Sequence, residues 1–312
     1  MTAGTDTLAF LFPGQGAQFV GMARDLIEQD TGAQRLLDDA EEQLRMPLRR
    51  LMLEGPEAEL QATQNAQPAI LFHSLALLRH VTAGGLTPGA LAGHSLGEFA
   101  GLVAAGGLDP LDALNAVRAR GQAMAAAAPM GTGMIAVLGL DDAAVARVCA
   151  EVDDVVPANY NAPGQVVVSG SDAGLEAVVP RLQQAGAKRL VRLPVSAAFH
   201  SPLMARAAEA FAKSWAEIPL RPLERPQVFN ADASVHSQPA EVRPLMVGQL
   251  TGPVRWTQSV QQLHRLGIDA FVEIGPRRTL TALVRKIIPD AVLHNVEDMA
   301  SASAFLQVAH AR

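Results

Sequence analysis

The apolar positions of the chain form short continuous runs that alternate with longer stretches of helical period. The runs at 8–12, 90–92 and 270–274 are each followed by a turn that contains glycine, which is typical of strands buried on both faces of a sheet. The spacing between the runs predicts helices, including 68–81, with Pro68 as its first residue. This alternation predicts an α/β fold. The other predicted helices outside the middle of the chain are 22–27, 35–44, 48–53, 57–61, 110–124, 203–215, 242–250, 256–266, 279–288 and 301–311.

The middle of the chain, from about residue 131 to 193, has a different pattern. Its elements follow the order strand, helix, strand, strand, helix, strand, with a turn at 161–164 between the two central strands. This is the order of a ferredoxin-like fold, so we expect a small domain inserted into a larger one. The six predicted elements are 134–138, 141–151, 155–159, 166–169, 172–185 and 189–193.

Composition and charge narrow the class of protein. The 312 residues are 49% hydrophobic and carry a formal net charge of −6, which allows a large core and argues against nucleic acid as the main partner. Cys149 is the single cysteine, so no internal disulfide can form, and its apolar helical setting predicts a buried thiol. The histidines lack metal-ligand spacing, and no apolar stretch approaches about 18 residues. We therefore expect a cytoplasmic protein without a metal site or a membrane segment.

The segment Gly93-His-Ser-Leu-Gly97 lies between a predicted strand and a predicted helix. This is the nucleophile-elbow pattern, in which the turn is too sharp for a Cβ atom at either glycine. Ser95 would stand at the start of the helix, where backbone N–H groups favour a developing oxyanion. A glycine-rich turn that carries a serine without catalytic function is the alternative reading of the motif alone.

Three further features could belong to the same site. The turn after the first strand carries Gln15, a neutral donor suited to a carbonyl or carboxylate group. The helix 110–124 is apolar nearly all round yet carries Arg118 and Arg120; each needs an anionic partner, either a carboxylate of the protein or an anionic substrate. The spacing does not choose between the two arginines. His200 lies just before a proline-initiated helix, where it could act as a base or serve only the structure.

Read together, the motifs resemble those of the malonyl-CoA:acyl-carrier-protein transacylases of fatty-acid and polyketide synthesis. Each motif is common by itself, but their order and spacing along nearly the whole chain are specific. The resemblance rests on Phe12-Pro-Gly-Gln-Gly16, Gly93-His-Ser-Leu-Gly-Glu98, Arg120-Gly121, Asn161-Ala-Pro-Gly-Gln165-Val-Val-Val-Ser-Gly170, Phe199-His200, Gly252-Pro-Val-Arg-Trp256 and Glu273-Ile-Gly-Pro276.

The resemblance implies an α/β-hydrolase-like large domain with a parallel sheet, made of residues 1–129 and 195–312, and a ferredoxin-like small domain of residues 130–194. It also implies a monomer that binds no cofactor. Its substrates would be malonyl-CoA and a phosphopantetheinylated acyl carrier protein, and the malonyl group would pass through a serine ester in a ping-pong reaction.

The resemblance also assigns roles to individual residues. Ser95 would be the nucleophile and His200 the base, with the backbone carbonyl of Gln249 in place of a triad acid. The backbone N–H groups of Gln15 and Leu96 would form the oxyanion hole. Two substrate-binding residues complete the implied site, namely Arg120, which would hold the malonyl carboxylate, and Phe199, whose bulk would exclude a methyl-branched acyl group.

Two other functions remain open on the sequence. An acyl-thioester hydrolase could use the same Ser95–His200 pair, although it would gain nothing from a carboxylate clamp. A docking protein for carrier domains would need neither residue. Basic residues that could meet an acidic carrier protein are Lys188, Arg189, Arg277, Arg278, Arg285 and Lys286.

Overall fold

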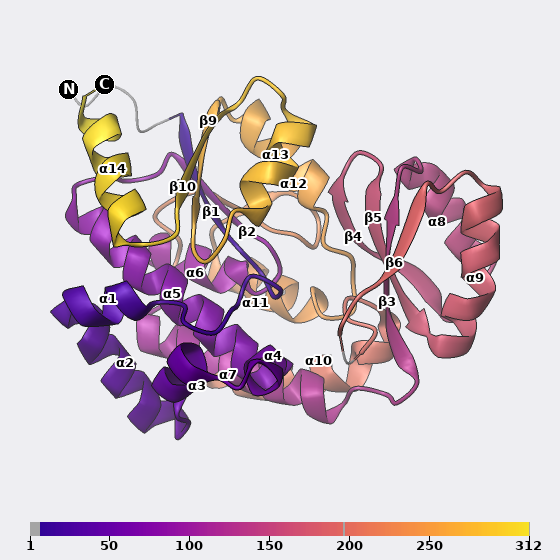
Figure 1. Ribbon diagram of the computed structural model, residues 1–312, viewed down its shortest axis with the longest axis horizontal. Coiled ribbons are helices and arrows are strands. Elements are labelled where there is room, and N and C mark those ends of the chain that lie inside the picture. Colours follow the sequence, from indigo (N-terminus) through magenta and orange to yellow (C-terminus); the bar gives the residue numbers. More distant parts are fainter. Residues whose placement is uncertain (1–6, 196, 312) are drawn as a thin grey trace.

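The computed structural model describes residues 7–195 and 197–311 (Figure 1). Its larger sheet has six strands in the order β10-β9-β1-β2-β7-β8, in which every neighbouring pair is parallel except the antiparallel pair β7–β8. The strands are β1 (Leu8–Phe12), β2 (Ala90–Gly93), β7 (Gln227–Val228), β8 (Val235–His236), β9 (Ala270–Ile274) and β10 (Val292–Val296). The predicted α/β fold with a parallel sheet is confirmed.

The apolar run of β1 follows from its burial on both faces. Phe10 and Phe12 belong to one core cluster, whereas Ala9 and Leu11, which alternate with them, belong to a second cluster on the other face of the sheet. Helices cover both faces (Figure 1). Those that contribute to the first cluster are α1 (Arg24–Gln29), α2 (Thr31–Leu44), α3 (Leu48–Glu54), α4 (Glu57–Gln61), α5 (Thr63–Ala83), α6 (Gly97–Ala104), α7 (Pro110–Ala126), α10 (Ala205–Glu217), α11 (Pro239–Gly248) and α14 (Met299–His310). The second cluster is formed with α12 (Trp256–Arg265) and α13 (Thr279–Ile287).

The smaller sheet is antiparallel, with the strand order β4-β5-β3-β6. Apolar residues of its strands and of the helices α8 and α9 form a separate core cluster. This is the predicted ferredoxin-like order, whereas the division of the chain at residues 129/130 and 194/195 stays a prediction. The elements are β3 (Thr132–Leu138), α8 (Asp142–Ala150), β4 (Val155–Ala162), β5 (Gln165–Ser171), α9 (Asp172–Gln184) and β6 (Arg189–Arg192).

The smaller sheet is joined along β4 to the loop that precedes α12. Tyr160 donates its backbone N–H to the carbonyl of Val254 at 2.9 Å, and Val254 donates to Ala158 at 2.8 Å. The predicted turn at 161–164 is too long, because β4 runs to Ala162, which pairs with Gln165 of β5. Asn161 is therefore part of a strand that packs against α12 and α13.

The prediction that Pro68 begins a helix is wrong. Helix α5 starts at Thr63 and has Pro68 in its interior. An interior proline cannot donate to the carbonyl four residues earlier. That carbonyl belongs to Gln64, and it accepts a hydrogen bond of 2.7 Å from Arg118 of α7 instead. The neighbouring helix thus supplies the donor that Pro68 lacks.

Helices α2, α11 and α14 also begin earlier than their apolar spacing predicts, and a polar cap accounts for α2 and α14. α2 starts at Thr31 because the Asp30 side chain accepts a hydrogen bond from the N–H of Gly32. α14 starts at Met299 because Asp298 and Ser301 form a capping box. In both helices the first turn is set by a polar cap, which a count of apolar positions does not register.

Candidate active site

The turn from β2 into α6 has the geometry of a nucleophile elbow. A Cβ atom on Gly93 would lie 1.9 Å from the carbonyl carbon of Gly97, and one on Gly97 would lie 2.1 Å from the carbonyl oxygen of Phe12. Ser95 adopts a left-handed backbone conformation with φ of 51°, which is uncommon for a residue with a side chain. The turn is held by Asn230, whose side chain accepts from the N–H of Ser95 at 2.7 Å and donates to the carbonyl of Gly93 at 2.8 Å.

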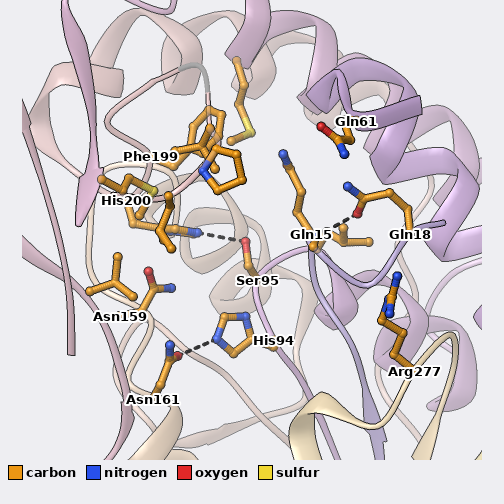
Figure 2. Close-up of a pocket in the computed structure, with 18 of the residues that line it drawn as sticks. Gln15, Gln18, Gln61, His94, Ser95, Asn159, Asn161, Phe199, His200 and Arg277 are labelled. Carbon is orange, nitrogen blue, oxygen red and sulfur yellow. Dashed lines mark hydrogen bonds between the residues drawn. The ribbon is translucent and has the colours of Figure 1, made fainter. Parts of the chain in front are cut away.

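His200 connects the nucleophile to a backbone carbonyl, and Figure 2 shows His200 beside Ser95. Its Nε2 lies 2.9 Å from the Oγ of Ser95, and its Nδ1 lies 2.8 Å from the carbonyl oxygen of Gln249. A carbonyl can only accept, so Nδ1 carries the proton and Nε2 is free to take one from the serine. Burial, together with the positive charge of Arg120, lowers the pKa of His200 to about 3, so the ring is neutral at physiological pH.

The structure separates the two arginines that the spacing left equivalent. Arg118 donates to the carbonyl of Gln64 and, at 3.1 Å, to the side chain of Asn65. Arg120 is 1% exposed and points into the site, where its Nη2 lies 3.0 Å from the Oγ of Ser95. Arg118 is therefore a structural residue that joins α7 to α5.

The partners of Arg120 are neutral oxygen atoms. Its Nη1 donates to the side chain of Gln67 at 2.8 Å, and its Nη2 donates to the side chain of Gln249 at 2.7 Å. Within residues 7–195 and 197–311 no carboxylate lies within 4.0 Å of this guanidinium, and its Nε has no hydrogen-bond partner. Burial lowers the pKa of Arg120 to about 10, so it remains charged at pH 7. A buried cation in this setting offers a site for an anionic group.

The interpretation of the sequence missed the polar residues beneath the site. Glu98 of α6 is 1% exposed and accepts hydrogen bonds from the backbone N–H of Asn230 and from the side-chain amide of Gln249. That amide also donates to the carbonyl of Ser95 at 3.1 Å. A glutamate in the first turn of a helix ordinarily reads as a solvated, dipole-compensating residue. The sequence did offer one sign that Glu98 is buried, because it is the single charged residue in the otherwise apolar helix α6.

A cavity of about 390 Å³ lies beside Ser95 and His200, and it is lined by strand residues of the smaller sheet and by the turns that follow β1 and β2 (Figure 2). Gln15 and Leu96 line it beside Ser95, which is where their backbone N–H groups would have to lie to form an oxyanion hole. Phe199 lines the cavity and is 5% exposed. The predicted site residues are thus brought together, and their roles remain to be tested.

The smaller sheet contributes a second polar pair to this cavity. The ring of His94 lies 2.9 Å through Nε2 from the Oδ1 of Asn161 on β4, and it packs against Trp256 with ring centroids 5.5 Å apart. Burial lowers the pKa of His94, which favours a neutral ring. This pair ties the elbow to the smaller sheet across the cavity.

The described part of the chain contains no group of three or more His, Cys, Asp or Glu residues arranged to hold a metal ion. Cys149 is buried, and burial raises the pKa of its thiol to about 12, as expected of an unreactive structural cysteine. Among the described helices none has both the length and the apolar character needed to cross a bilayer.

Comparison with known proteins places this geometry in a family. A family model described as the acyl transferase domain matches residues 9–305. The malonyl CoA-acyl carrier protein transacylase of Bacillus subtilis (strain 168) is 43% identical over 285 residues, which cover 90% of each chain. That of Escherichia coli (strain K12) is 38% identical, over 96% of this chain and 99% of its own.

Solved structures agree with these matches. The malonyl-CoA:acyl carrier protein transacylase of Xanthomonas oryzae superposes with a TM-score of 0.93 at 40% identity, covering 97% of this chain and 98% of that one. A malonyl-transacylase solved in complex with a type II PKS acyl-carrier protein has a TM-score of 0.93 at 37% identity, over 96% and 99% of the two chains. The chain therefore belongs to the acyl transferase family, and its relatives are malonyl transacylases.

Proposed function

We propose that this enzyme transfers a malonyl group from malonyl-CoA to the phosphopantetheine thiol of an acyl carrier protein. The observation that carries the proposal is the buried guanidinium of Arg120 beside the nucleophile, since its described protein partners are neutral. Malonyl is an acyl group that ends in a carboxylate, one methylene from the reacting carbonyl. Arg120 would hold that carboxylate with the carbonyl within reach of Ser95.

In the first half-reaction the Oγ of Ser95 attacks the thioester carbonyl while His200 accepts the hydroxyl proton through Nε2. The carbonyl of Gln249 keeps the ring in the required tautomer and stabilises the imidazolium that forms. Negative charge develops on the thioester oxygen, toward which we assign the N–H groups of Gln15 and Leu96; such donors are worth about 3 kcal/mol each in a transition state. The C–S bond then breaks, and His200 returns the proton to the leaving CoA sulfur.

In the second half-reaction the thiol of the carrier's phosphopantetheine enters the same cavity. His200 accepts its proton, the sulfur attacks the malonyl-serine ester, and the proton returns to the Oγ of Ser95 as the ester bond breaks. Each step exchanges one acyl bond for another and moves one proton, so the reaction is ping-pong. All the groups that it uses are side chains and backbone amides, so we propose that no bound metal or cofactor takes part.

Selectivity for malonyl follows from the same site. An acetyl group would leave the buried guanidinium of Arg120 without an anion in direct contact, which penalises uncharged acyl groups. Phe199 lines the cavity, and we assign to its ring the exclusion of acyl groups with a branch at the α-carbon. The carbonyl of Phe199 accepts a hydrogen bond of 2.5 Å from Ser169 of β5, so this residue is anchored to the smaller sheet.

The site is complete within one chain, which supports a monomer as the active unit. Malonyl-CoA is a metabolite of the cytoplasm, where we place the reaction.

The division into a large domain of residues 1–129 and 195–312 and a small domain of 130–194 is consistent with the two separate sheets and with a cavity between them. The acidic net charge of −6 favours a protein partner over nucleic acid, and the partner is proposed to meet the basic residues at the cavity mouth.

The test is to mix the protein briefly with malonyl-CoA and to record its intact mass, with Ser95→Ala as the control. A malonyl adduct that requires Ser95 and that moves to added carrier protein is the expected result. Rapid release of free malonate without transfer would replace the proposal with a hydrolase. Absence of both an adduct and turnover would leave a docking protein.

A further inference from the structure

Beneath the nucleophile lies a buried carboxylate that the proposed reaction does not use. Both oxygens of Glu98 accept hydrogen bonds, one from the N–H of Asn230 and one from the amide of Gln249. Accepting at both oxygens is the pattern of an ionised carboxylate. The other end of the Gln249 amide accepts from Arg120, so a single amide group bridges the buried anion and the buried cation.

The charges around this bridge can be counted. Glu98 and Arg120 are each 1% exposed, and together they are neutral when Glu98 is ionised. The other charged group that acts on Glu98 is Asp232, while His200 contacts the Gln249 of the bridge and His94 is a neighbour of His200. Burial lowers the pKa of both histidines, so their rings are uncharged here. Asp232 follows β7, has a side chain that is 40% exposed, and pairs with His236 at 2.8 Å, so solvent and that histidine moderate its charge.

A malonyl carboxylate that binds Arg120 upsets this balance, because one buried cation would then face two buried anions. An uncompensated buried charge is costly, and a carboxyl group relieves it by accepting a proton. Burial already raises the pKa of Glu98 to about 8, and a second nearby anion shifts a carboxyl pKa further in the same direction. Glu98 is therefore the group that can adjust the charge of the site at mildly alkaline pH.

We propose that, at mildly alkaline pH, Glu98 is the counter-ion of Arg120 in the empty site and that it takes up a proton from solvent when a malonyl carboxylate binds Arg120. The step balances as an ionised Glu98 plus one solvent proton giving the neutral acid, while the serine proton goes separately to CoA through His200. Glu98 is thus a positioning residue, which acts on the substrate through Gln249 and Arg120. The proposal rests on the proposed function, since it requires a bound malonyl group.

The proton can be measured directly by calorimetry. Malonyl-CoA is titrated into the Ser95→Ala variant at pH 8.5, where binding occurs without chemistry, in two buffers of different ionisation enthalpy. The dependence of the observed heat on the buffer gives the number of protons taken up. Acetyl-CoA, which shares the CoA moiety and lacks the carboxylate, is titrated in parallel.

The expected result is an uptake larger with malonyl-CoA than with acetyl-CoA by about 0.5–0.75 proton, which is lost when Glu98→Gln is added to the variant. Asp232→Asn is the matched control, because it removes the other carboxylate that faces this site and should retain the difference. Equal uptake with the two ligands would overturn the proposal, and so would a difference that persists in Glu98→Gln. If Glu98→Gln does not fold, the comparison of the two ligands on the Ser95→Ala protein decides.

Equilibrium loading of the unmodified enzyme gives an independent measurement. At a fixed ratio of malonyl-CoA to CoA, the ratio of malonyl-serine to free serine should fall by up to about tenfold per pH unit above pH 8. A Glu98→Gln enzyme, exposed to the same titration of the CoA thiol, should lack this fall. Loading that is equally pH-dependent in both would refute the role of Glu98 while leaving malonyl transfer established; an enzyme that never loads would refute the transfer itself.

Discussion

The Nη2 of Arg120 and the Oγ of Ser95 are 3.0 Å apart, so the buried cation and the nucleophile share one end of the cavity. In a malonyl thioester the carboxylate and the reacting carbonyl are separated by one methylene. A clamp this close to the nucleophile suits a short acyl group with a terminal charge. The same contact makes the two residues interdependent, which leads to the first prediction.

Replacing Arg120 with glutamine should lower the rate of malonyl loading about 10²–10⁴-fold, because breaking a buried charge pair costs about 3–5 kcal/mol. Loading from acetyl-CoA should fall far less, so the ratio of the two rates measures the clamp. Arg118→Gln is the matched control, since Arg118 bonds only to α5 among its described partners. It should lower the free energy of unfolding by about 1–3 kcal/mol and preserve the preference for malonyl. A similar loss of preference in both variants would contradict the assignment.

On the acid side, the midpoint of the pH dependence of the loading rate should lie well below pH 6.5. His200 is buried beside Arg120, which lowers its pKa to about 3, so the base stays neutral and able to accept a proton at pH 5.5. The rate at pH 5.5 is therefore expected to stay above half of that at pH 7. In Arg120→Gln the repelling charge is absent, so the midpoint should move up toward 6.5. Stopped-flow loading across this range checks both points; a midpoint near 6.5 in the unmodified enzyme would show that His200 is more solvated than its burial indicates.

Burial of neutral histidines also predicts instability in acid. Burial lowers the pKa of His73 to about 4, in addition to the shift at His200, so the unfolded chain binds more protons than the native protein between pH 6.5 and 4. The free energy of unfolding should fall as the pH falls through this window, by about 1.4 kcal/mol per pH unit for each histidine. Urea denaturation from pH 7 to 4.5 measures the slope. In His73→Gln the free energy of unfolding should depend less steeply on pH, by the contribution of one histidine.

Adding a methyl group at the elbow should disrupt the fold. In Gly97→Ala the new Cβ would lie 2.1 Å from the carbonyl oxygen of Phe12, and backbone on both sides leaves little room to yield. We expect a loss of more than about 3 kcal/mol in the free energy of unfolding, as for other overpacked cores. Gly248→Ala, where no atom lies within 4 Å of the added Cβ, should be neutral. Denaturant titration of the two variants compares them, and equal stability would mean that the turn can widen.

Charge reversal at the cavity mouth should weaken the use of carrier protein. Arg277 lines the cavity and lies over the ring of Phe19 at 5.2 Å, while the exposed Arg278 pairs with Glu297. Changing both to glutamate is expected to raise the KM for carrier protein about tenfold, with a smaller effect on loading from malonyl-CoA, because like charges repel at an electrostatically steered interface. Arg181→Glu, on α9 of the smaller sheet, is the control for net charge. An unchanged KM for carrier protein would remove Arg277 and Arg278 from the interface.

The predictions from the sequence were correct where a structural feature depends on neighbouring residues, and they failed where it depends on residues far away in the chain. The continuous apolar run of β1 and the two glycines of the elbow act over a few residues, and both predictions agree with the structure. Pro68 misled because its missing hydrogen bond is compensated by Arg118, 50 positions later in the chain. Glu98 was missed because its partners, Asn230 and Gln249, lie 132 and 151 residues away.

The amino-acid sequence by itself determined the α/β fold, the elbow and the presence of a serine, a histidine and two arginines suited to acyl chemistry, because those features follow from apolar periodicity, turn sterics and residue type. Only the tertiary structure decided which arginine faces the nucleophile. It also brought His200 to Ser95 across 105 residues and Gln249 to His200 across 49. Hydrogen bonds and charges act over a few ångströms in space, and the packing of β2, α6, α7 and the loop after α11 is what sets those distances.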